Sequence, residues 1–127
     1  DLFAVFEQAP SAVTAALAIQ RAMQAAAWPD GNDVRLRIGL HRGRPTLTDT
    51  GYVGLSVHAG ARICSAAHGG QIVLSSAVRN ALPEGIAVKE LGAWRFRGLP
   101  EPVELFQVEA DGLLTEFPPL RSATAAT

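Results

Sequence analysis

The sequence predicts an α+β domain in which one sheet is covered by helices on one face. Segments with helical spacing of apolar residues alternate with short extended segments, in the order strand, helix, strand, helix, strand, short helix and two strands. The chain has 127 residues, 48% of them hydrophobic, which is enough for one domain with a buried core. Layer rules alone leave several topologies open.

The first strand and the first helix are expected within residues 2–28. Residues 2–7 are apolar and partly aromatic, which favours a strand. A helix should follow, with Ser11 as its N-cap. A turn at residues 29–32, Pro-Asp-Gly-Asn, should end this helix. Its apolar stripe is made mostly of alanine: Ala12, Ala16, Ile19, Met23 and Ala26.

The middle of the chain predicts a second strand and a second helix. Residues 34–41 alternate between apolar and other side chains, which is typical of an antiparallel strand with one covered face and one exposed face. Residues 42–53 contain Gly, Pro and Thr and are expected to form a loop. A helix over residues 54–67 follows, and Gly69-Gly70 should end it with a left-handed cap.

The last third predicts short strands and a tail. We expect a strand over residues 71–74, a short helix capped by Ser75 or Ser76 that ends before Pro83, and extended segments over residues 86–97 and 103–108. Residues 1–108 would then form the domain. Residues 109–127, which include two adjacent prolines and a small polar end, suggest a linker or tail.

Composition excludes several classes of function. The net charge of −1 gives no general attraction to nucleic acid, although the basic and aromatic residues 94–97 resemble a base-stacking pattern. The single cysteine excludes an intrachain disulfide. No apolar run is long enough to span a bilayer. We therefore expect neither a membrane nor a nucleic acid as a partner of this domain.

Two basic side chains on the second predicted helix form the clearest candidate site. His58 and Arg62 are four residues apart, so they lie one turn from each other on one side of the helix. Spacing alone leaves two alternatives open. The pair belongs to a solvated polar face, or it forms an anion site in which Arg62 donates charge-assisted hydrogen bonds to a phosphate. The opposite side carries small residues expected to pack on the sheet: Val53, Val57, Gly60, Ala61 and Cys64.

The remaining reactive side chains are expected to have structural roles. Cys64 is interpreted as a buried structural cysteine. His41 is interpreted as polar decoration at a strand end, and His68 as a residue favoured at a helix C-terminus by the helix dipole. The three histidines and the cysteine do not have the spacing of a metal site.

Four segments and the order in which they occur give information about the family that composition does not give. They read "LFAVFEQAPSAVTAALAIQRAM", "VRLRIGLHRGRP", "GYVGLSVHAGARICSAAHGGQIVLS" and "FRGLPEPVELFQV". In series they resemble the catalytic domain of class III adenylate and guanylate cyclases, over about residues 1–108. The resemblance implies a ferredoxin-like cyclase fold with a mainly antiparallel sheet, whose N-terminal part precedes this chain.

The resemblance also implies a reaction. Such domains pair head to tail as homodimers, and each active site lies between two chains. Two aspartates of one chain hold two Mg²⁺ or Mn²⁺ ions on a nucleoside triphosphate, and the ribose 3′-hydroxyl attacks the α-phosphate to release pyrophosphate. An Asn and an Arg, one helical turn apart on the other chain, orient the ribose and stabilise the transition-state charge.

The correspondence can be made residue by residue. Arg62 matches the transition-state Arg, and His58 stands where the family has Asn. Gly51 stands where the family has an acidic base-reading residue, and Arg97 lies near the position of a basic residue that faces the triphosphate. The segment around residues 4–6 matches the strand after the metal aspartates, so both metal ligands are expected upstream of residue 1.

Two hypotheses follow from the resemblance. The chain is part of a bacterial, cytoplasmic cyclase that converts a nucleoside triphosphate, with ATP favoured, to a 3′,5′-cyclic nucleotide in intracellular signalling. The alternative is a degenerate cyclase fold that dimerises or senses nucleotides without turnover. In either case the tail resembles the segment that leads, in some bacterial members, to an ATPase and regulator portion.

Overall fold

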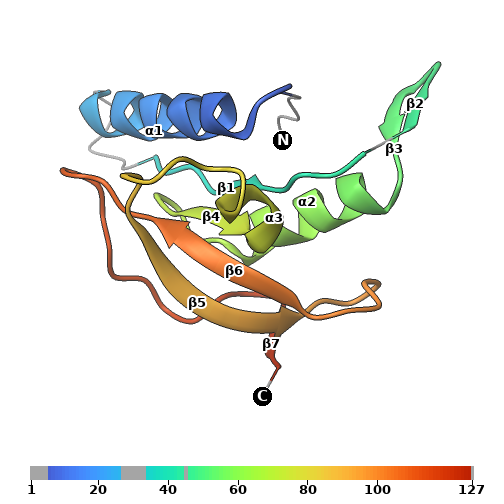
Figure 1. Ribbon diagram of the computed structural model, residues 1–127. Coiled ribbons are helices and arrows are strands. Elements are labelled where there is room, and N and C mark those ends of the chain that lie inside the picture. The colour runs from blue at the N-terminus through green and yellow to red at the C-terminus, as the bar shows by residue number, and fades with distance from the viewer. Residues whose placement is uncertain (1–5, 27–33, 45, 127) are drawn as a thin grey trace.

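The computed structural model (Figure 1) describes residues 6–26, 34–44 and 46–126. The predicted strand over residues 2–7 lies mostly outside this part; its described end, Phe6 and Glu7, is not in a strand. The predicted turn at residues 29–32 also lies outside it.

The elements in chain order are α1 (Ala9–Ala25), β1 (Ile38–Leu40), β2 (Thr46–Thr48), β3 (Gly51–Val53), α2 (Leu55–Ala66), β4 (Ile72–Ser75), α3 (Ser76–Arg79), β5 (Val88–Arg95), β6 (Val103–Val108) and β7 (Thr124–Ala125).

The main sheet has the strand order β1-β4-β6-β5-β7. Every pairing in it is antiparallel except that of β1 with β4, which is parallel and joins Ile38 to Ile72 in register. The predicted α+β class with a mainly antiparallel sheet is confirmed. The expectation that the strand over residues 34–41 would be antiparallel is wrong, because α2 separates β1 from its partner and returns the chain in the same direction.

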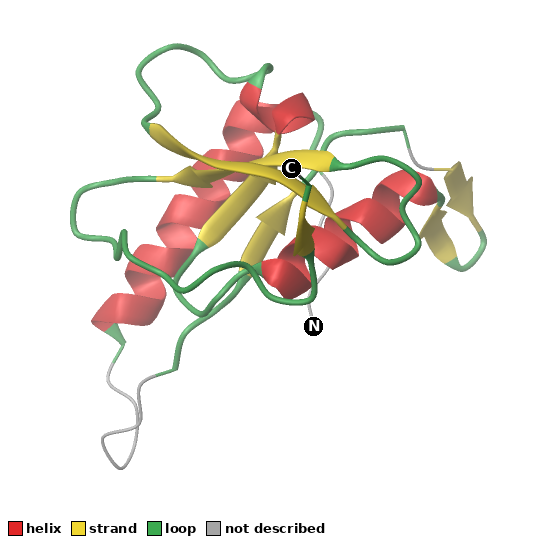
Figure 2. Cartoon of the chain, turned by 90° about the horizontal axis from the view of Figure 1, so that it is seen from below, coloured by secondary structure: helices red, strands yellow, loops and turns green. Residues whose placement is uncertain are grey.

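The two long helices cover opposite faces of the sheet, and the prediction of a single covered face is therefore wrong. Along β4, Ile72 and Leu74 pack with α1, whereas Val73 packs with α2. Figure 1 shows α1 above the strands, and Figure 2 shows the same helix behind them when the chain is seen from below. A strand covered on both faces needs apolar residues at consecutive positions, which "IVL" in β4 provides.

The first helix begins earlier than predicted and buries a different stripe. Its N-cap is Gln8, and no side chain caps it, so the assignment of Ser11 as N-cap is wrong. The buried residues are Val13, Ala16 and Gln20, while Ile19 is 40% exposed and Ala26 is also exposed. Alanine at many positions makes the apolar direction of this helix ambiguous from spacing.

Gln20 explains why a polar residue can lie in that buried stripe. Its side-chain Nε2 donates to the backbone oxygen of Leu36 at 2.8 Å and to that of Gln71 at 3.4 Å. These hydrogen bonds satisfy the amide donor and tie α1 to the segment before β1 and to the segment before β4.

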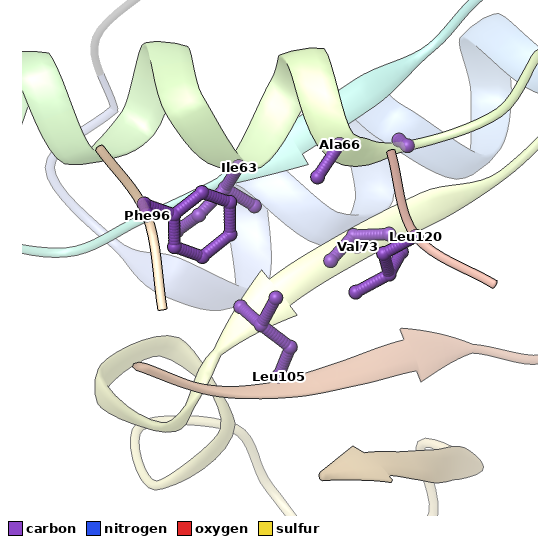
Figure 3. Packing of buried hydrophobic residues seen from close by; sticks show 7 residues of the cluster. Ile63, Ala66, Val73, Phe96, Leu105 and Leu120 are labelled. Atoms are coloured by element: carbon purple, nitrogen blue, oxygen red, sulfur yellow. The ribbon is translucent and has the colours of Figure 1, made fainter. Parts of the chain in front are cut away.

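The core on the α2 side joins residues that are far apart in the sequence. Figure 3 shows the cluster, which consists of Ile63, Ala66, Ala67, Val73, Phe96, Leu105 and Leu120. Leu120 comes from the predicted tail. The Arg121 N–H donates to the backbone oxygen of Ala66 at 2.9 Å, and β7 pairs with β5. Residues 120–125 thus pack on the domain and do not behave as a free linker.

Two local predictions need correction around α2. Residues 46–53, expected to be loop, form the hairpin β2–β3, which projects from the sheet (Figure 1). The helix over residues 54–67 is confirmed as α2, but it ends at Ala66, and the left-handed glycine is Gly70, with φ +91°. The short helix α3 has Ser75 as its N-cap, as predicted, although the Ser75 hydroxyl does not bond to the helix.

Candidate functional site

Helix α2 positions the two residues that the sequence singled out. It begins after Gly54, whose φ of +128° allows the sharp entry from the hairpin. His58 and Arg62 are both half-buried. The Nε atom of Arg62 is buried and has no hydrogen-bond partner among the described residues. A buried N–H without a partner costs about 1–3 kcal/mol. No acceptor among the described residues offsets this cost at the Arg62 Nε.

The predicted small face of α2 is only partly the packed face. Ala59, Ile63 and Ala66 are the buried residues of the helix, whereas Ala61 and Val53 are exposed. Gly60 and Cys64 do face β1, because a Cβ at Gly39 would lie 2.6 Å from the Cα of Cys64, and a Cβ at Gly60 would lie 3.9 Å from the Cβ of His41. The helix therefore packs through two adjoining stripes, one on the core and one on β1.

The turn over residues 96–99 reaches the His58 side of α2. Phe96 is 4% exposed within the core, and the Leu99 N–H donates to the Phe96 oxygen at 3.2 Å. Gly98, with φ +87°, lies directly against His58, since a Cβ there would be 2.8 Å from the His58 Nε2. Arg97, the residue before Gly98, is exposed. The turn that carries Arg97 therefore lies against His58.

The segment after β1 lies against the helix as well. A Cβ at Gly43 would collide with the Ser56 hydroxyl. His41 is half-buried, and its Nδ1 is 2.8 Å from the Oγ of Ser75. Burial lowers the pKa of His41 from its usual 6.5. The interpretation of His41 as edge decoration is therefore wrong, and its bond explains why the Ser75 hydroxyl does not cap α3.

Gly51 is not brought into contact with the other candidate residues. It pairs with Thr48 in the projecting hairpin, and nothing lies within 4 Å of a Cβ built on it. Its φ of +122° favours glycine at this position. Within this chain, Gly51 therefore has a conformational role that does not depend on a ligand.

The other side chains with assigned structural roles make defined contacts. The His68 ring donates from Nε2 to the Pro119 oxygen at 2.9 Å and stacks on Phe117, so it holds the tail and does not cap the helix by charge alone. Cys64 is half-buried, with its thiol 3.5 Å from the Arg37 oxygen. The Trp94 indole N–H donates to the Leu91 oxygen at 2.7 Å. His68, Cys64 and Trp94 therefore each make a contact with another residue of the domain.

No group of three or more His, Cys, Asp or Glu side chains in residues 6–26, 34–44 and 46–126 could hold a metal ion. In the same ranges, no helix has both the length and the hydropathy needed to cross a membrane.

Comparison with known proteins identifies relatives for nearly the whole chain. The family model of the adenylate and guanylate cyclase catalytic domain matches residues 3–110. An uncharacterised protein of Mycobacterium tuberculosis is 39% identical over 127 residues; the match covers 97% of this chain and 42% of that protein. A receptor-type adenylate cyclase of Trypanosoma brucei brucei, GRESAG 4.3, is 35% identical over 89 residues, or 62% of this chain and 7% of that protein.

Solved structures share the fold. An adenylate/guanylate cyclase/hydrolase from Silicibacter pomeroyi superposes with a TM-score of 0.74 at 27% identity, covering 84% of this chain and 66% of that one. The chain thus spans less than half of the length of its mycobacterial relative but most of the fold of this solved domain.

Proposed function

The chain belongs to the adenylate and guanylate cyclase catalytic domain family, and from this premise we propose that it is part of an enzyme that makes a 3′,5′-cyclic nucleotide and pyrophosphate from a nucleoside triphosphate. ATP is the proposed substrate, since the trypanosomal relative is an adenylate cyclase. The observation that carries the proposal is the Nε of Arg62, a buried donor without a partner in the described chain. Arg62 as a whole is only half-buried, and a phosphate that binds its guanidinium would supply an acceptor and the opposite charge.

Each candidate residue receives a role in this proposal. Arg62 stabilises negative charge on the α-phosphate in the transition state. His58, one turn before it, donates to a ribose oxygen in place of the family's Asn. Arg97, exposed on the turn that touches His58, faces the triphosphate. Gly51 offers no side chain to the base, so it does not select adenine over guanine.

The ligands of the metal ions are proposed to lie outside the described part of this chain. Cyclases of this family use Mg²⁺ or Mn²⁺, but the described residues of this chain contain no group of three or more His, Cys, Asp or Glu side chains that could hold a metal ion. We place the metal ligands upstream of residue 1 and derive no step through a metal bound by this chain. The site is proposed to form between two chains in a head-to-tail homodimer, in a cytoplasmic protein whose later residues lead to an ATPase or regulator portion.

The direct test measures cyclic AMP and cyclic GMP formation by the intact protein with Mn²⁺ or Mg²⁺. Arg62→Ala should lower kcat by at least about a hundredfold, with a smaller change in KM, because its interaction is made mainly in the transition state. Arg21→Ala is the matched control, since Arg21 is exposed on α1, on the opposite face of the sheet. It should retain wild-type activity.

Two outcomes would contradict the proposal. The intact protein could form no product from either nucleotide, and nucleotide binding without turnover would then support the degenerate, sensing alternative, which the comparisons do not favour. Arg62→Ala could also be as active as Arg21→Ala, which would remove the role given to Arg62.

A further inference from the structure

The backbone of Gly98 faces the ring of His58 and leaves no room for a side chain between them. A Cβ built on Gly98 would lie 2.8 Å from Nε2, 3.6 Å from Cε1 and 3.8 Å from Cδ2, and these three nearest atoms all belong to the imidazole. The distance to Nε2 is shorter than real Cβ contacts allow. Any side chain at position 98 would therefore displace the ring.

The turn that carries Gly98 is anchored and cannot simply withdraw. Phe96 is 4% exposed and packs in the core cluster with Ile63 of α2 (Figure 3). Leu99 packs against the same cluster, and its N–H bonds to the Phe96 oxygen. Two core contacts thus flank Gly98, while His58 is attached through a side chain that can rotate. If the contact becomes too close, the imidazole moves and the backbone stays.

We propose that Gly98 is a positioning residue for His58. Its bare backbone forms a wall against which the Nε2 side of the ring rests, and this contact directs Nδ1 toward the substrate. Nδ1 is bonded to Cγ, like the amide nitrogen and oxygen of an asparagine, so it reaches equally far from the helix. The inference rests on the proposed function, in which His58 contacts the ribose, and it adds a specific geometry to that role.

The matched variants separate this contact from backbone strain. Gly98→Ala introduces a methyl group at a left-handed φ of +87°. Gly112→Ala and Gly85→Ala introduce the same methyl group at φ +86° and φ +102°, where nothing lies within 4 Å of the new Cβ. All three variants carry the conformational cost of a non-glycine residue at positive φ. Only Gly98→Ala also pushes on His58.

The first measurement is NMR of the histidine rings in the intact protein, with isotope-labelled histidine. Residues 1–127 contain three histidines, so His41 and His68 serve as internal references for His58. We expect the His58 ring resonances to shift in Gly98→Ala and to stay in place in Gly85→Ala and Gly112→Ala. Unchanged His58 resonances in a folded Gly98→Ala protein would overturn the proposal.

The second measurement is kinetic and uses His58→Asn, whose side chain is too short to reach the wall at Nε2. Gly98→Ala should lower kcat by roughly tenfold or more, since small misplacements of a reacting group are costly. In the His58→Asn background the same change should have an effect of less than about twofold, because the coupled partner is gone. An equal loss in both backgrounds would show that Gly98 acts through the fold and not through His58.

Failure of the proposed function has a different signature. If the wild-type protein forms no cyclic nucleotide, the proposed roles of His58 and Gly98 in catalysis are both contradicted. The NMR comparison still decides whether Gly98 orients the His58 ring, because it requires no turnover.

Discussion

Two histidines, His41 after β1 and His58 on α2, are held by different kinds of contact. The ring of His41 is hydrogen-bonded to Ser75 and half-buried, whereas the ring of His58 rests on the backbone of Gly98. A hydrogen bond depends on which ring nitrogen faces the partner atom. A steric contact restricts only the orientation of the ring. At the residue scale, these two positions should therefore respond differently to substitution of the residue that each ring contacts.

His41 should make stability depend on pH in the weakly acidic range. Its folded-state pKa is lowered by burial from 6.5, so the unfolded chain binds the proton more readily than the folded one. The stabilising contribution is fully present above pH 6.5 and is lost as the pH falls through the lowered folded pKa. We expect denaturant midpoints of the wild-type protein to fall across this interval.

The variant His41→Asn provides the check on this prediction. Asparagine can keep a polar atom near the Ser75 hydroxyl, but it does not titrate. Its denaturant midpoint should therefore change less than that of the wild type between about pH 7 and pH 5. An identical pH dependence in the two proteins would assign the effect to other groups.

Spacing in the sequence was sufficient to find one part of the candidate site. His58 and Arg62 are four residues apart in a helix that the structure confirms, so their proximity follows from local geometry. Their contacts with the rest of the chain were not predictable in this way. His58 contacts Gly98, and His41 contacts a serine that is 34 residues away in the sequence. Local periodicity of the sequence carries no information about such long-range contacts.

At the scale of elements, α2 approaches β1 closely at Gly39. A Cβ at Gly39 would lie 2.6 Å from the Cα of Cys64 and 2.9 Å from the carbonyl carbon of Ile63, both of which are backbone atoms. The strand and the helix can be this close only because β1 has no side chain at that position. This contact also explains why the face of β1 that was expected to be exposed is covered.

Gly39→Ala should therefore destabilise the fold by about 1–3 kcal/mol or more, as expected for overpacking against a rigid backbone. Gly60→Ala is the matched control, because its Cβ would meet only His41 at 3.9 Å. Within a helix this change should be neutral or should stabilise by about 0.5–1 kcal/mol. Chemical unfolding of both variants gives the comparison, and similar stabilities would contradict the close packing of α2 on β1.

The predictability of the elements depended on how distinctive their patterns are. Strong periodicity predicts the strand over residues 103–108 and the helix over residues 54–67. The observed bounds of β6 and α2 agree with these ranges to within one residue. The apolar stripe of α1 was misplaced because its alanines point in every direction. The strand β7 was missed because two residues, Thr124 and Ala125, become a strand only by pairing with β5.

At the scale of the whole molecule, the proposed site needs two chains. In the proposed head-to-tail homodimer, one chain supplies Arg62 and His58 to a site whose metal ligands belong to the other chain. Catalysis by an isolated chain would then lack half of the site. The association of chains and the reaction should therefore be linked.

Specific activity of the intact protein should rise with protein concentration and level off as the dimer forms, because mass action governs a site shared by two chains. Cyclic nucleotide formation and sedimentation measured over the same concentrations provide the check. Arg21→Ala should follow the wild-type curve, since its side chain is exposed on α1. Constant specific activity at concentrations where only monomer sediments would contradict a shared site.

The sequence by itself determined the α+β class, the family resemblance, the position of the strongly periodic elements and the pairing of His58 with Arg62 on one helix side. Periodicity reports the local backbone geometry, and ordered motifs report ancestry. Only the tertiary structure decided that α1 and α2 cover opposite faces, that β1 runs parallel to β4, and that Gly98 supports His58. These features depend on contacts between residues far apart in the chain, and such contacts are set by how the elements pack.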